Sequence, residues 1–442
     1  MRSRDHFATR LGFVLAAAGS AVGLGNIWKF PFMTGQNGGG AFLVLYAVFV
    51  LTIGLSVMLA EFAIGRAGQR NPVGSFRALK GGAWPTVGGL GVIAGFVILS
   101  FYSVVGGWTL AYAVKSVSGA LASNDPKVLG AAFGAFIADP LDVTGFHTVF
   151  MVLTLVIVAG GVRHGIERAA RILMPILALL VIVLAVRAMT LDGAAKGIAF
   201  FLTPDFSRVT WNTVNAALGQ AFFSLSLGMG TMITYASYLD RQINLPKTAA
   251  QVTLLDTGFA VIAGLMVLPA VFAFGFDPAA GPGLTFITLP AVFAQMPAGA
   301  LFAFLFFALL AIAALTSAVS IIEPVVSYLI DERKMSRRAA TWGAGAVTWA
   351  LGVPSALSLG PWKDVTVGGK GILDAVDYLA SNIMLPLGGI LITLFVGWSV
   401  AARAVDEAQS GGDHPFALAK VWIFICRFVA PAAVAWVMIS GL

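Results

Sequence analysis

The sequence predicts an all-α polytopic membrane protein, made of two five-helix inverted repeats with discontinuous helices 1 and 6, plus one extra helix. Of the 442 residues, 59% are hydrophobic and only 11% are charged, with a mean hydropathy of +0.91. Soluble proteins carry about one-quarter charged residues to cover their surface. The apolar residues form runs long enough to cross a bilayer. Two runs are interrupted by glycines at corresponding places in the two halves of the chain.

Eleven apolar runs follow one another, separated by charged or Gly- and Pro-rich connections. At roughly 20 residues per crossing, with some helices longer and tilted, each run is expected to span the membrane once. The first run has no small-residue cleavage pattern, so we expect a retained helix and not a signal peptide. The runs cover residues 15–31, 41–64, 87–117, 146–162, 172–188, 214–235, 249–274, 299–330, 340–353, 373–400 and 421–442.

The repeats are expected at residues 1–190 (helices 1 to 5) and 191–405 (helices 6 to 10), with helix 11 in residues 406–442. Most of the 27 Lys and Arg residues lie in connections on the side of the amino terminus. By the positive-inside rule this terminus is cytoplasmic, and an odd number of spans places the carboxyl terminus outside. The same distribution accounts for the net charge of +7, so no nucleic-acid partner is expected.

Other classes of protein need residues that this pattern does not supply. The single cysteine, Cys426, allows no internal disulfide and no thiolate cluster, and the four histidines lie near the ends of runs. An enzyme would need a nucleophile beside a base, or paired acids. A channel would need a continuous polar lining, whereas the polar residues here gather at one depth. The pattern therefore excludes an enzyme and disfavours a channel.

The two interrupted runs are the most informative feature. Residues 19–25 read GSAVGLG and residues 224–230 read SLSLGMG, each with a Gly-x-Gly near mid-membrane depth. Two such glycines weaken a helix by roughly 1 kcal/mol each, and an opened helix frees backbone groups that lipid cannot satisfy. The alternative is that the glycines only let helices pack closely. Their corresponding places in two halves favour an inverted repeat with a site at the midplane.

At these residues the chain resembles the neurotransmitter:sodium symporter family, and its bacterial amino-acid transporters of the eleven-helix type more than its animal members. The resemblance implies sodium-coupled secondary active uptake of a zwitterionic amino acid by alternating access. A carrier for a non-amino-acid solute, such as a compatible osmolyte, is the main alternative. The resemblance covers nearly the whole chain and is carried by residues 4–31, 37–66 (from NGGGAF), 219–238 (from GQAFFS), 286–290 (FITLP) and 315–324 (LTSAVSIIEP).

The resemblance implies two sodium sites built from oxygen ligands. Asp256 lies in an apolar stretch, where a bare carboxylate costs at least ~2.5 kcal/mol, so it needs a cation. Relatives with an amide at this position require chloride, so we expect transport to be chloride-independent. For Thr316 and Ser317 the alternative is hydrogen bonding to their own helix. The implied ligands are Ala21, Asn26, Ser224 and Asp256 for the first ion, and Gly19, Val22, Ala313, Thr316 and Ser317 for the second.

The implied amino-acid pocket combines opened backbone with apolar side chains. Monoamine carriers have an acid where this chain has Gly23, so a substrate with its own carboxylate is expected. The uncharged Ile98 and Met229 favour a large hydrophobic or aromatic side chain, in the range from tryptophan, tyrosine and phenylalanine to leucine. The implied substrate-binding residues are Ala21, Gly23, Gly25, Ile98, Tyr102, Phe223, Ser224, Ser226, Met229, Ser317, Ser320 and Ile321.

Alternating access requires gates on both sides of the pocket. Lys29 and Asp377 are expected to form an outer ion pair above Phe223, and Arg4 an inner one with Asp331. Lysine should make a looser gate than the arginine of many relatives, because it cannot form a bidentate contact. The alternative for Arg4 is that it only follows the positive-inside rule.

Three further residues are expected to support these movements. Glu61 is implied as an acceptor for the free N–H groups of the broken helices, and Gly165 with Pro175 is expected to let the fifth helix unwind toward the second sodium site. The lack of a long, cysteine-bearing second outer loop is typical of a bacterial inner (cytoplasmic) membrane protein. The expected partners are a small amino acid, sodium ions and the lipid bilayer, while the oligomeric state stays open.

Overall fold

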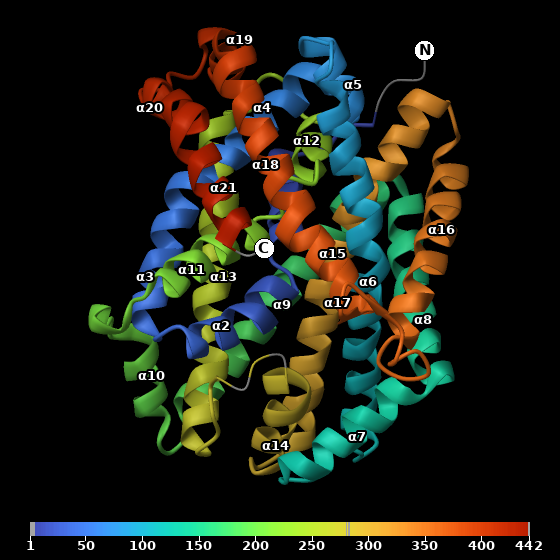
Figure 1. The fold of residues 1–442 in the computed structure, drawn as a ribbon, viewed down its shortest axis with the longest axis vertical. Helices are drawn as coiled ribbons and strands as arrows, with labels where there is room; N and C mark the ends of the chain where they lie inside the picture. The colour runs from blue at the N-terminus through green and yellow to red at the C-terminus, as the bar shows by residue number, and fades with distance from the viewer. Residues whose placement is uncertain (1–4, 280, 282, 441–442) are drawn as a thin grey trace.

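The computed structural model describes residues 5–279, 281 and 283–440, and its long helices run along the longest axis of the molecule (Figure 1). By length and composition, eight helices of the described residues could cross a membrane. The all-α membrane fold is therefore confirmed. The eight are Gly40–Gly68 (α3, η2, α4), Pro85–Val117 (α6), Pro140–Ala159 (α8), Val162–Met189 (η3, α9), Leu245–Ala273 (α13), Gly299–Arg333 (α15), Ile372–Ser399 (α17, η6, α18, η7) and Ala419–Ser440 (α20, η9, α21).

The remaining three predicted runs are also helical, and two of them are broken. The first run consists of α1 (Arg10–Ala21) and a second piece, Gly25–Gln36 (η1, α2), and the two are bent by 50° at the break. The sixth consists of α11 (Trp211–Ser224) and α12 (Thr231–Ala236). The ninth is one helix, α16 (Arg337–Leu357). The predicted discontinuous helices 1 and 6 are thus present.

Short elements connect these spans at both ends of the molecule. In Figure 1, α5 and α19 lie at the end that holds the amino terminus, and α7 and α14 lie at the opposite end. The only strands of the described residues are β1 (Thr366–Val367) and β2 (Lys370–Gly371), which pair antiparallel. The connecting helices are α5 (Pro72–Leu79), α7 (Pro126–Ala138), α10 (Ala194–Leu202), η4 (Phe206–Arg208), η5 (Leu284–Thr288), α14 (Leu289–Ala294), α19 (Ala401–Ala408) and η8 (Ser410–Gly412).

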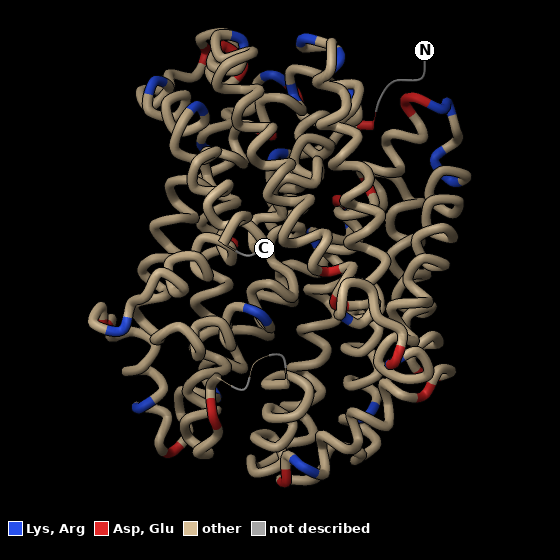
Figure 2. Tube along the Cα trace, in the orientation of Figure 1, with Lys and Arg blue, Asp and Glu red and all other residues tan. Residues whose placement is uncertain are grey.

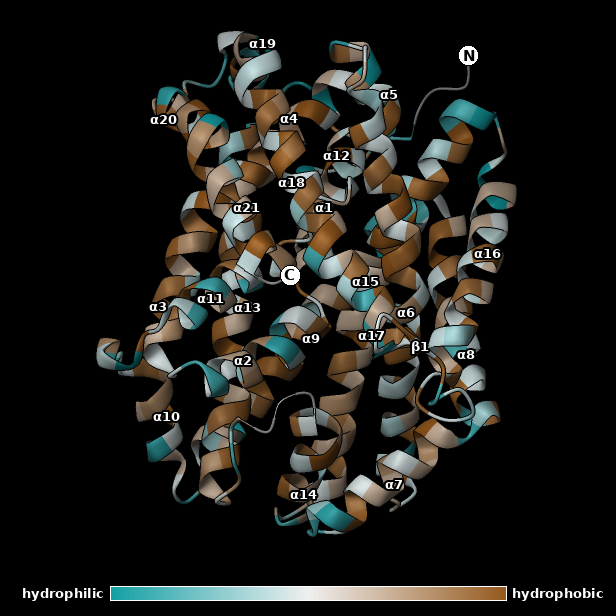
Figure 3. Cartoon of the chain, in the orientation of Figure 1, coloured by the Kyte–Doolittle hydropathy of each residue, from teal (hydrophilic) through white to brown (hydrophobic). Residues whose placement is uncertain are grey.

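Charge and hydropathy divide the molecule into two ends and a central band. Figure 2 shows Lys, Arg, Asp and Glu concentrated at the two ends, and most of the Lys and Arg lie at the end of the amino terminus. The central band in Figure 3 is predominantly hydrophobic. This is the distribution of a multi-pass protein whose middle lies in hydrocarbon.

The centre of the bundle is formed by α6 and α15. Within their most apolar windows, 72% of α6 and 78% of α15 is buried inside the protein, against 22% for Ala419–Ser440. The two central helices pack on each other, and α15 also packs on α1 and α12. The breaks in helices 1 and 6 therefore lie against the most buried helices, away from lipid.

Candidate functional site

The two breaks expose backbone groups inside the protein. In the second break, Ser226, Gly228 and Gly230 have φ angles of 53°, 85° and 76°, a left-handed conformation that glycine adopts without steric cost. The Gly228 N–H donates to Glu61 Oε1 at 2.7 Å. In the first break, the Gly23 N–H donates to Asn26 Oδ1 at 3.3 Å. Side chains of the protein therefore satisfy the opened backbone, as membrane burial requires.

Ser20 joins the two broken helices to α15. Its carbonyl accepts hydrogen bonds from Ser226 Oγ at 2.9 Å and Ser317 Oγ at 3.1 Å. Its hydroxyl accepts from Ser320 Oγ at 2.7 Å. Sequence reasoning did not select Ser20, although it lies within the polar 19–25 stretch. All four serines are buried, so they form one polar contact between the two broken helices and α15.

Three of the four residues expected at the first sodium site, Asn26, Ser224 and Asp256, contact one another. Asn26 Nδ2 donates to Asp256 Oδ1 at 2.8 Å, and Ser224 Oγ donates to Asp256 Oδ2 at 2.9 Å. Tyr46, which sequence reasoning missed, places its hydroxyl 3.3 Å from Asp256 Oδ2 and 3.1 Å from Ser224 Oγ. All of these residues are buried, as is Ala21. Amide, hydroxyl and carboxylate oxygens are donors that suit a hard cation.

The residues expected at the second sodium site lie where α1 meets α15. Ser317 Oγ is 3.4 Å from the Gly19 carbonyl oxygen. Thr316 Oγ1 donates to the Ala313 carbonyl at 3.0 Å, which is the hydrogen bond to its own helix that was the alternative for this residue. Val22 follows the last residue of α1 and is also buried. The structure therefore brings carbonyl groups of α1 close to the hydroxyl-bearing residues of α15.

A small cavity leads from this second group toward the fifth helix. Its volume is about 10 Å³, and it is lined by Gly19 and Thr316 as well as Ile166; a cavity of this order holds about one water molecule. Gly165 lies in η3 (Val162–Glu167), where a Cβ would be 2.0 Å from the Ile157 carbonyl oxygen. Pro175 lies inside α9 (Arg168–Met189). Both features weaken regular helical hydrogen bonding next to the cavity.

The expected substrate position centres on Gly23. A Cβ at Gly23 would lie 2.4 Å from Ser317 Oγ and 3.1 Å from Tyr102 Oη. The Leu24 N–H donates to Tyr102 Oη at 3.4 Å. The opened backbone of helix 1 thus faces two hydroxyl groups, one from α6 and one from α15.

Apolar side chains continue the site between α6, helix 6 and α15. Ile98, Met229 and Ile321 are each 4% exposed. Glycines of α6 allow the close approach of their helices: a Cβ at Gly91 would lie 3.0 Å from the Met229 carbonyl carbon, and one at Gly95 would lie 2.8 Å from the Ile321 carbonyl oxygen. The backbone at Met229 and Ile321 therefore lies close to α6, the helix that carries Ile98.

On the outer side, Phe223 and Lys29 cover the break. Lys29 Nζ lies 4.3 Å from the centroid of the Phe223 ring, and a Cβ at Gly25 would lie 3.2 Å from the same ring. The expected Lys29–Asp377 ion pair stays a prediction. No contact within 4.0 Å joins these two residues in the described part of the chain, and Asp377 Oδ1 accepts from Ser381 Oγ at 2.8 Å. The aromatic face of Phe223 attracts the ammonium group through a cation–π interaction, and Asp377 also attracts Lys29 electrostatically.

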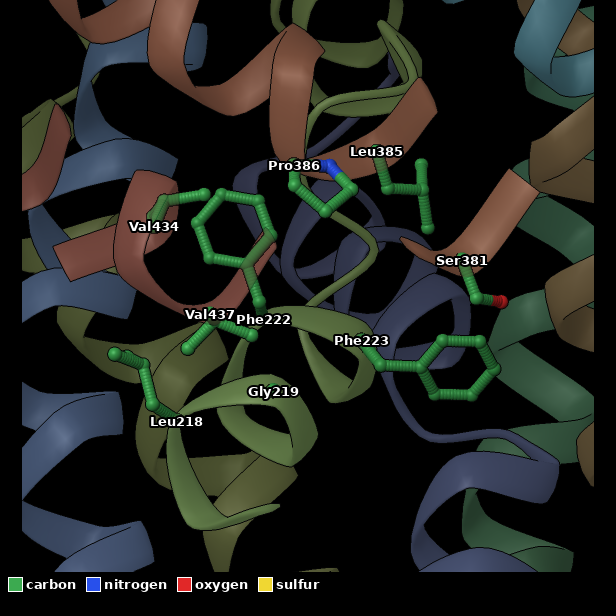
Figure 4. Close-up of a pocket in the computed structure, with 9 residues that line it drawn as sticks. All are labelled: Leu218, Gly219, Phe222, Phe223, Ser381, Leu385, Pro386, Val434 and Val437. Carbon is green, nitrogen blue, oxygen red and sulfur yellow. The ribbon is translucent and has the colours of Figure 1, made fainter. Parts of the chain in front are cut away.

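Behind Phe223 lies a cavity of about 40 Å³. Figure 4 shows its lining, which comes from α11, from the segment η6 to α18, and from α21. The lining is mostly apolar, with Ser381 as its one polar side chain. The Phe223 side chain therefore has free volume beside it.

On the inner side, a buried ion pair ties several helices together. Glu323 is fully buried and accepts from Tyr238 Oη at 2.7 Å and from Arg337 Nη2 at 2.6 Å. Arg337 also donates to the Val158 carbonyl at 2.9 Å and lies 3.4 Å from Asp5 Oδ2. The partners of Glu323 lie on other helices and could not be deduced from the sequence.

The expected inner gate falls partly outside the described residues. Arg4 is not among them, so the predicted Arg4–Asp331 pair stays a prediction. Asp331 Oδ2 accepts the Asn71 N–H at 2.8 Å. Phe7 follows Arg4 closely in the sequence. Its ring packs edge-on against Tyr235, at 5.7 Å between ring centroids, and against Phe13, at 5.4 Å. The inner ends of helices 1 and 6 are therefore closed by aromatic packing as well.

Comparison with known proteins decides the class. The model of the sodium:neurotransmitter symporter family matches residues 4–128 and 137–442. The chain belongs to this family. It is 46% identical to MhsT, whose crystal structure in complex with L-phenylalanine matches all of both chains with a TM-score of 0.91.

Two bacterial relatives support this assignment. The transporter is 41% identical to YhdH, named as an uncharacterised sodium-dependent transporter of Bacillus subtilis, over 98% of this chain and 97% of the relative. It is 36% identical to an uncharacterised sodium-dependent transporter of Haemophilus influenzae, over 100% of this chain and 99% of the relative. The chain is therefore a sodium-dependent transporter and not an enzyme, and the resemblance found in its motifs is confirmed.

Proposed function

We propose that the transporter takes up a zwitterionic amino acid with a large apolar or aromatic side chain, together with sodium, by alternating access and without chloride. The observation that carries the proposal is the place of Gly23 between the hydroxyls of Tyr102 and Ser317. This position offers no acid to hold a bare amine. The Tyr102 hydroxyl is a donor suited to a carboxylate.

The apolar half of the site supports the choice of side chain. Ile98, Met229 and Ile321 carry no charge, and their burial creates a surface that favours a hydrophobic group. Met229 can repack around side chains of several sizes because its thioether chain is flexible. The complex of MhsT with L-phenylalanine, at 46% identity, agrees with this class of substrate.

We further propose two sodium ions per cycle. The first would be held by Asn26, Ser224 and Asp256 with the Ala21 carbonyl, and the second by helix-1 carbonyls with Thr316 and Ser317. Asp256 brings a fixed negative charge into the first site. Its carboxylate supplies the charge that chloride supplies in relatives with an amide there, which supports chloride independence.

The two groups of residues that close the site, one on each side of the membrane, are the proposed gates. Phe223 with Lys29 above it would open outward, and the Glu323–Arg337 network with Phe7 would open inward. The fifth helix would unwind at Gly165 and Pro175 and admit water to the second ion. The two breaks support repeats at residues 1–190 and 191–405, followed by the additional helix.

We also propose that the protein lies in a bacterial inner membrane with its amino terminus in the cytoplasm. The concentration of Lys and Arg at that end in Figure 2 supports this orientation. The relatives from Bacillus subtilis and Haemophilus influenzae support a bacterial membrane.

Reconstitution into liposomes tests the function. We expect labelled phenylalanine, tryptophan or leucine to accumulate under an inward sodium gradient, and not under potassium or proton gradients. Replacing chloride with gluconate should leave uptake unchanged. Competition by a compatible osmolyte such as betaine, without competition by any amino acid, would replace this proposal with the osmolyte carrier.

A further inference from the structure

An arginine lies within the last apolar helix. Arg427 stands eight residues after Ala419, the first residue of the span Ala419–Ser440. At a rise of 1.5 Å per residue, this places its Cα about 12 Å along the helix from the Lys420 end. An ionisable side chain at such a position is costly in lipid and needs a partner.

The neighbouring helix holds Arg427 in place. Arg427 Nε donates to the Gly397 carbonyl at 2.6 Å, and Gly397 lies in the π-turn Phe395–Ser399 (η7), which packs against the π-turn Ile425–Val429 (η9). A Cβ at Gly397 would lie 2.8 Å from Arg427 Cγ, so glycine is needed for this approach. The arginine is thus built into a contact between two helices.

The remaining donors of Arg427 have no partner within the described part of the chain. A guanidinium group carries five N–H donors, and only the one on Nε is used. No carboxylate lies within 4.0 Å of it among the described residues, and the side chain is partly exposed. Hydrocarbon cannot satisfy four N–H groups of a cation, so an acceptor must come from outside the described part of the chain.

Exposed aromatic rings continue from the arginine along the surface of the helix. The guanidinium carbon lies 5.4 Å from the ring centroid of Trp398, which is 59% exposed. Trp398 packs edge-on against Phe428 at 5.3 Å, and Phe428 lies 5.4 Å from Phe424. Trp398 is the last residue but one of the span Ile372–Ser399, where tryptophan is typical of the level of lipid headgroups. The long side chain of Arg427 can extend toward this level. This places a cation beside rings that can contact acyl chains.

We propose that Arg427 and Trp398 bind the headgroup phosphate of an anionic phospholipid, whose acyl chain lies along Phe428 and Phe424. The planar guanidinium can bind phosphate oxygens through two parallel hydrogen bonds. An anionic lipid is favoured because its headgroup phosphate is not balanced by a choline, and because Arg427 has no carboxylate partner among the described residues. On the proposed orientation this is the cytoplasmic leaflet, whose negative surface attracts basic groups. The site lies on the lipid-facing surface of the last two spans, Ile372–Ser399 and Ala419–Ser440. It is separate from the proposed substrate pocket.

The test measures lipid binding to the purified full-length transporter in detergent, by native mass spectrometry and by the shift of the unfolding temperature. The lipids are phosphatidylglycerol and phosphatidylcholine, and inorganic phosphate is a third arm. The wild type should bind phosphatidylglycerol about tenfold more tightly than phosphatidylcholine, and Arg427→Gln should remove this preference by weakening phosphatidylglycerol about tenfold. Inorganic phosphate alone should give no shift, since it has no acyl chain.

Matched variants separate this site from general charge effects. Lys363→Gln removes one exposed positive charge far along the chain and should leave the lipid preference unchanged. Arg427→Lys keeps the charge without the planar group and should keep part of the preference. Equal binding of both lipids by the wild type, or undiminished phosphatidylglycerol binding by Arg427→Gln, overturns the proposal. If Arg427→Gln does not fold, the wild-type comparison and Arg427→Lys still decide it.

Discussion

Gly23 and Ser317 lie so close that a Cβ on Gly23 would be 2.4 Å from Ser317 Oγ. The same hydroxyl is 3.1 Å from the Ser20 carbonyl oxygen and 3.4 Å from that of Gly19. The expected substrate position and the expected second sodium site are therefore in direct contact. A change at one of them must displace the other.

Substitution of Gly23 by alanine should abolish most of the uptake. The added methyl group must push the Ser317 hydroxyl away, and overpacking of this kind costs about 1–3 kcal/mol, so we expect initial uptake to fall about tenfold or more. The measurement is sodium-driven uptake of labelled phenylalanine in liposomes. The matched control is Gly343→Ala in α16, where a Cβ would meet no atom within 4 Å; it should retain uptake. Normal uptake by Gly23→Ala would contradict the proposed pocket.

Substitution of Asp256 by asparagine should make transport depend on chloride. The variant keeps the size of the side chain but removes the negative charge that faces Asn26 and Ser224. We expect uptake in gluconate to fall about tenfold and to recover when chloride is added. The exposed Asp364→Asn is the control and should behave like the wild type. Loss of wild-type uptake in gluconate would show that the carboxylate does not replace chloride.

Substitution of Pro175 by alanine should slow turnover without weakening substrate binding. A proline inside a helix costs about 3 kcal/mol of helical stability, so its removal from α9 favours the regular helix that closes the path to the second sodium site. We expect kcat to fall several-fold while the KM for phenylalanine changes little. Pro354→Ala in α16 is a matched change of a helical proline and should leave both constants unchanged. A larger effect on KM than on kcat would argue against unwinding.

Substitution of Arg337 by glutamine should open the inner side. Breaking a buried ion pair leaves Glu323 without its cationic partner and costs about 3–5 kcal/mol in the closed form. A cysteine introduced at the buried Ala16 should therefore react faster with a thiol reagent. The native Cys426 is buried and gives little background. Arg338→Gln, next in the chain and exposed, is the control; equal rates in all three proteins would remove the network from the gate.

The fold and part of the site could be predicted because their causes are local. The hydrophobic runs and the two Gly-x-Gly breaks are properties of short segments, and both breaks are present in the structure. The cluster of Asn26, Ser224 and Asp256 followed from motifs of a recognisable family. The bounds of the helices were predicted less well: the first helix begins at Arg10 and not at residue 15, and the fifth span begins at Val162 and not at residue 172.

The partners that were missed come from distant helices. Tyr46 reaches Asp256 across 210 positions of sequence, and Arg337 reaches Asp5 across 332. Nothing in the pattern around a tyrosine or an arginine indicates which helix it will face. The contact between Lys29 and the Phe223 ring could not be predicted for a related reason: the two residues lie on different broken helices, and their approach depends on how these helices pack. The ion pair expected between Lys29 and Asp377 stays a prediction.

The double role of Asn26 has a consequence for energy conversion. Its Oδ1 accepts the Gly23 N–H while its Nδ2 donates to Asp256, so one amide joins the proposed first sodium site to the proposed substrate position. A disturbance of the proposed sodium site therefore also disturbs the proposed substrate position, and the reverse. Such an arrangement suppresses slippage, in which an ion or a solute crosses alone, and so lets a sodium gradient be converted into uphill accumulation with little leak.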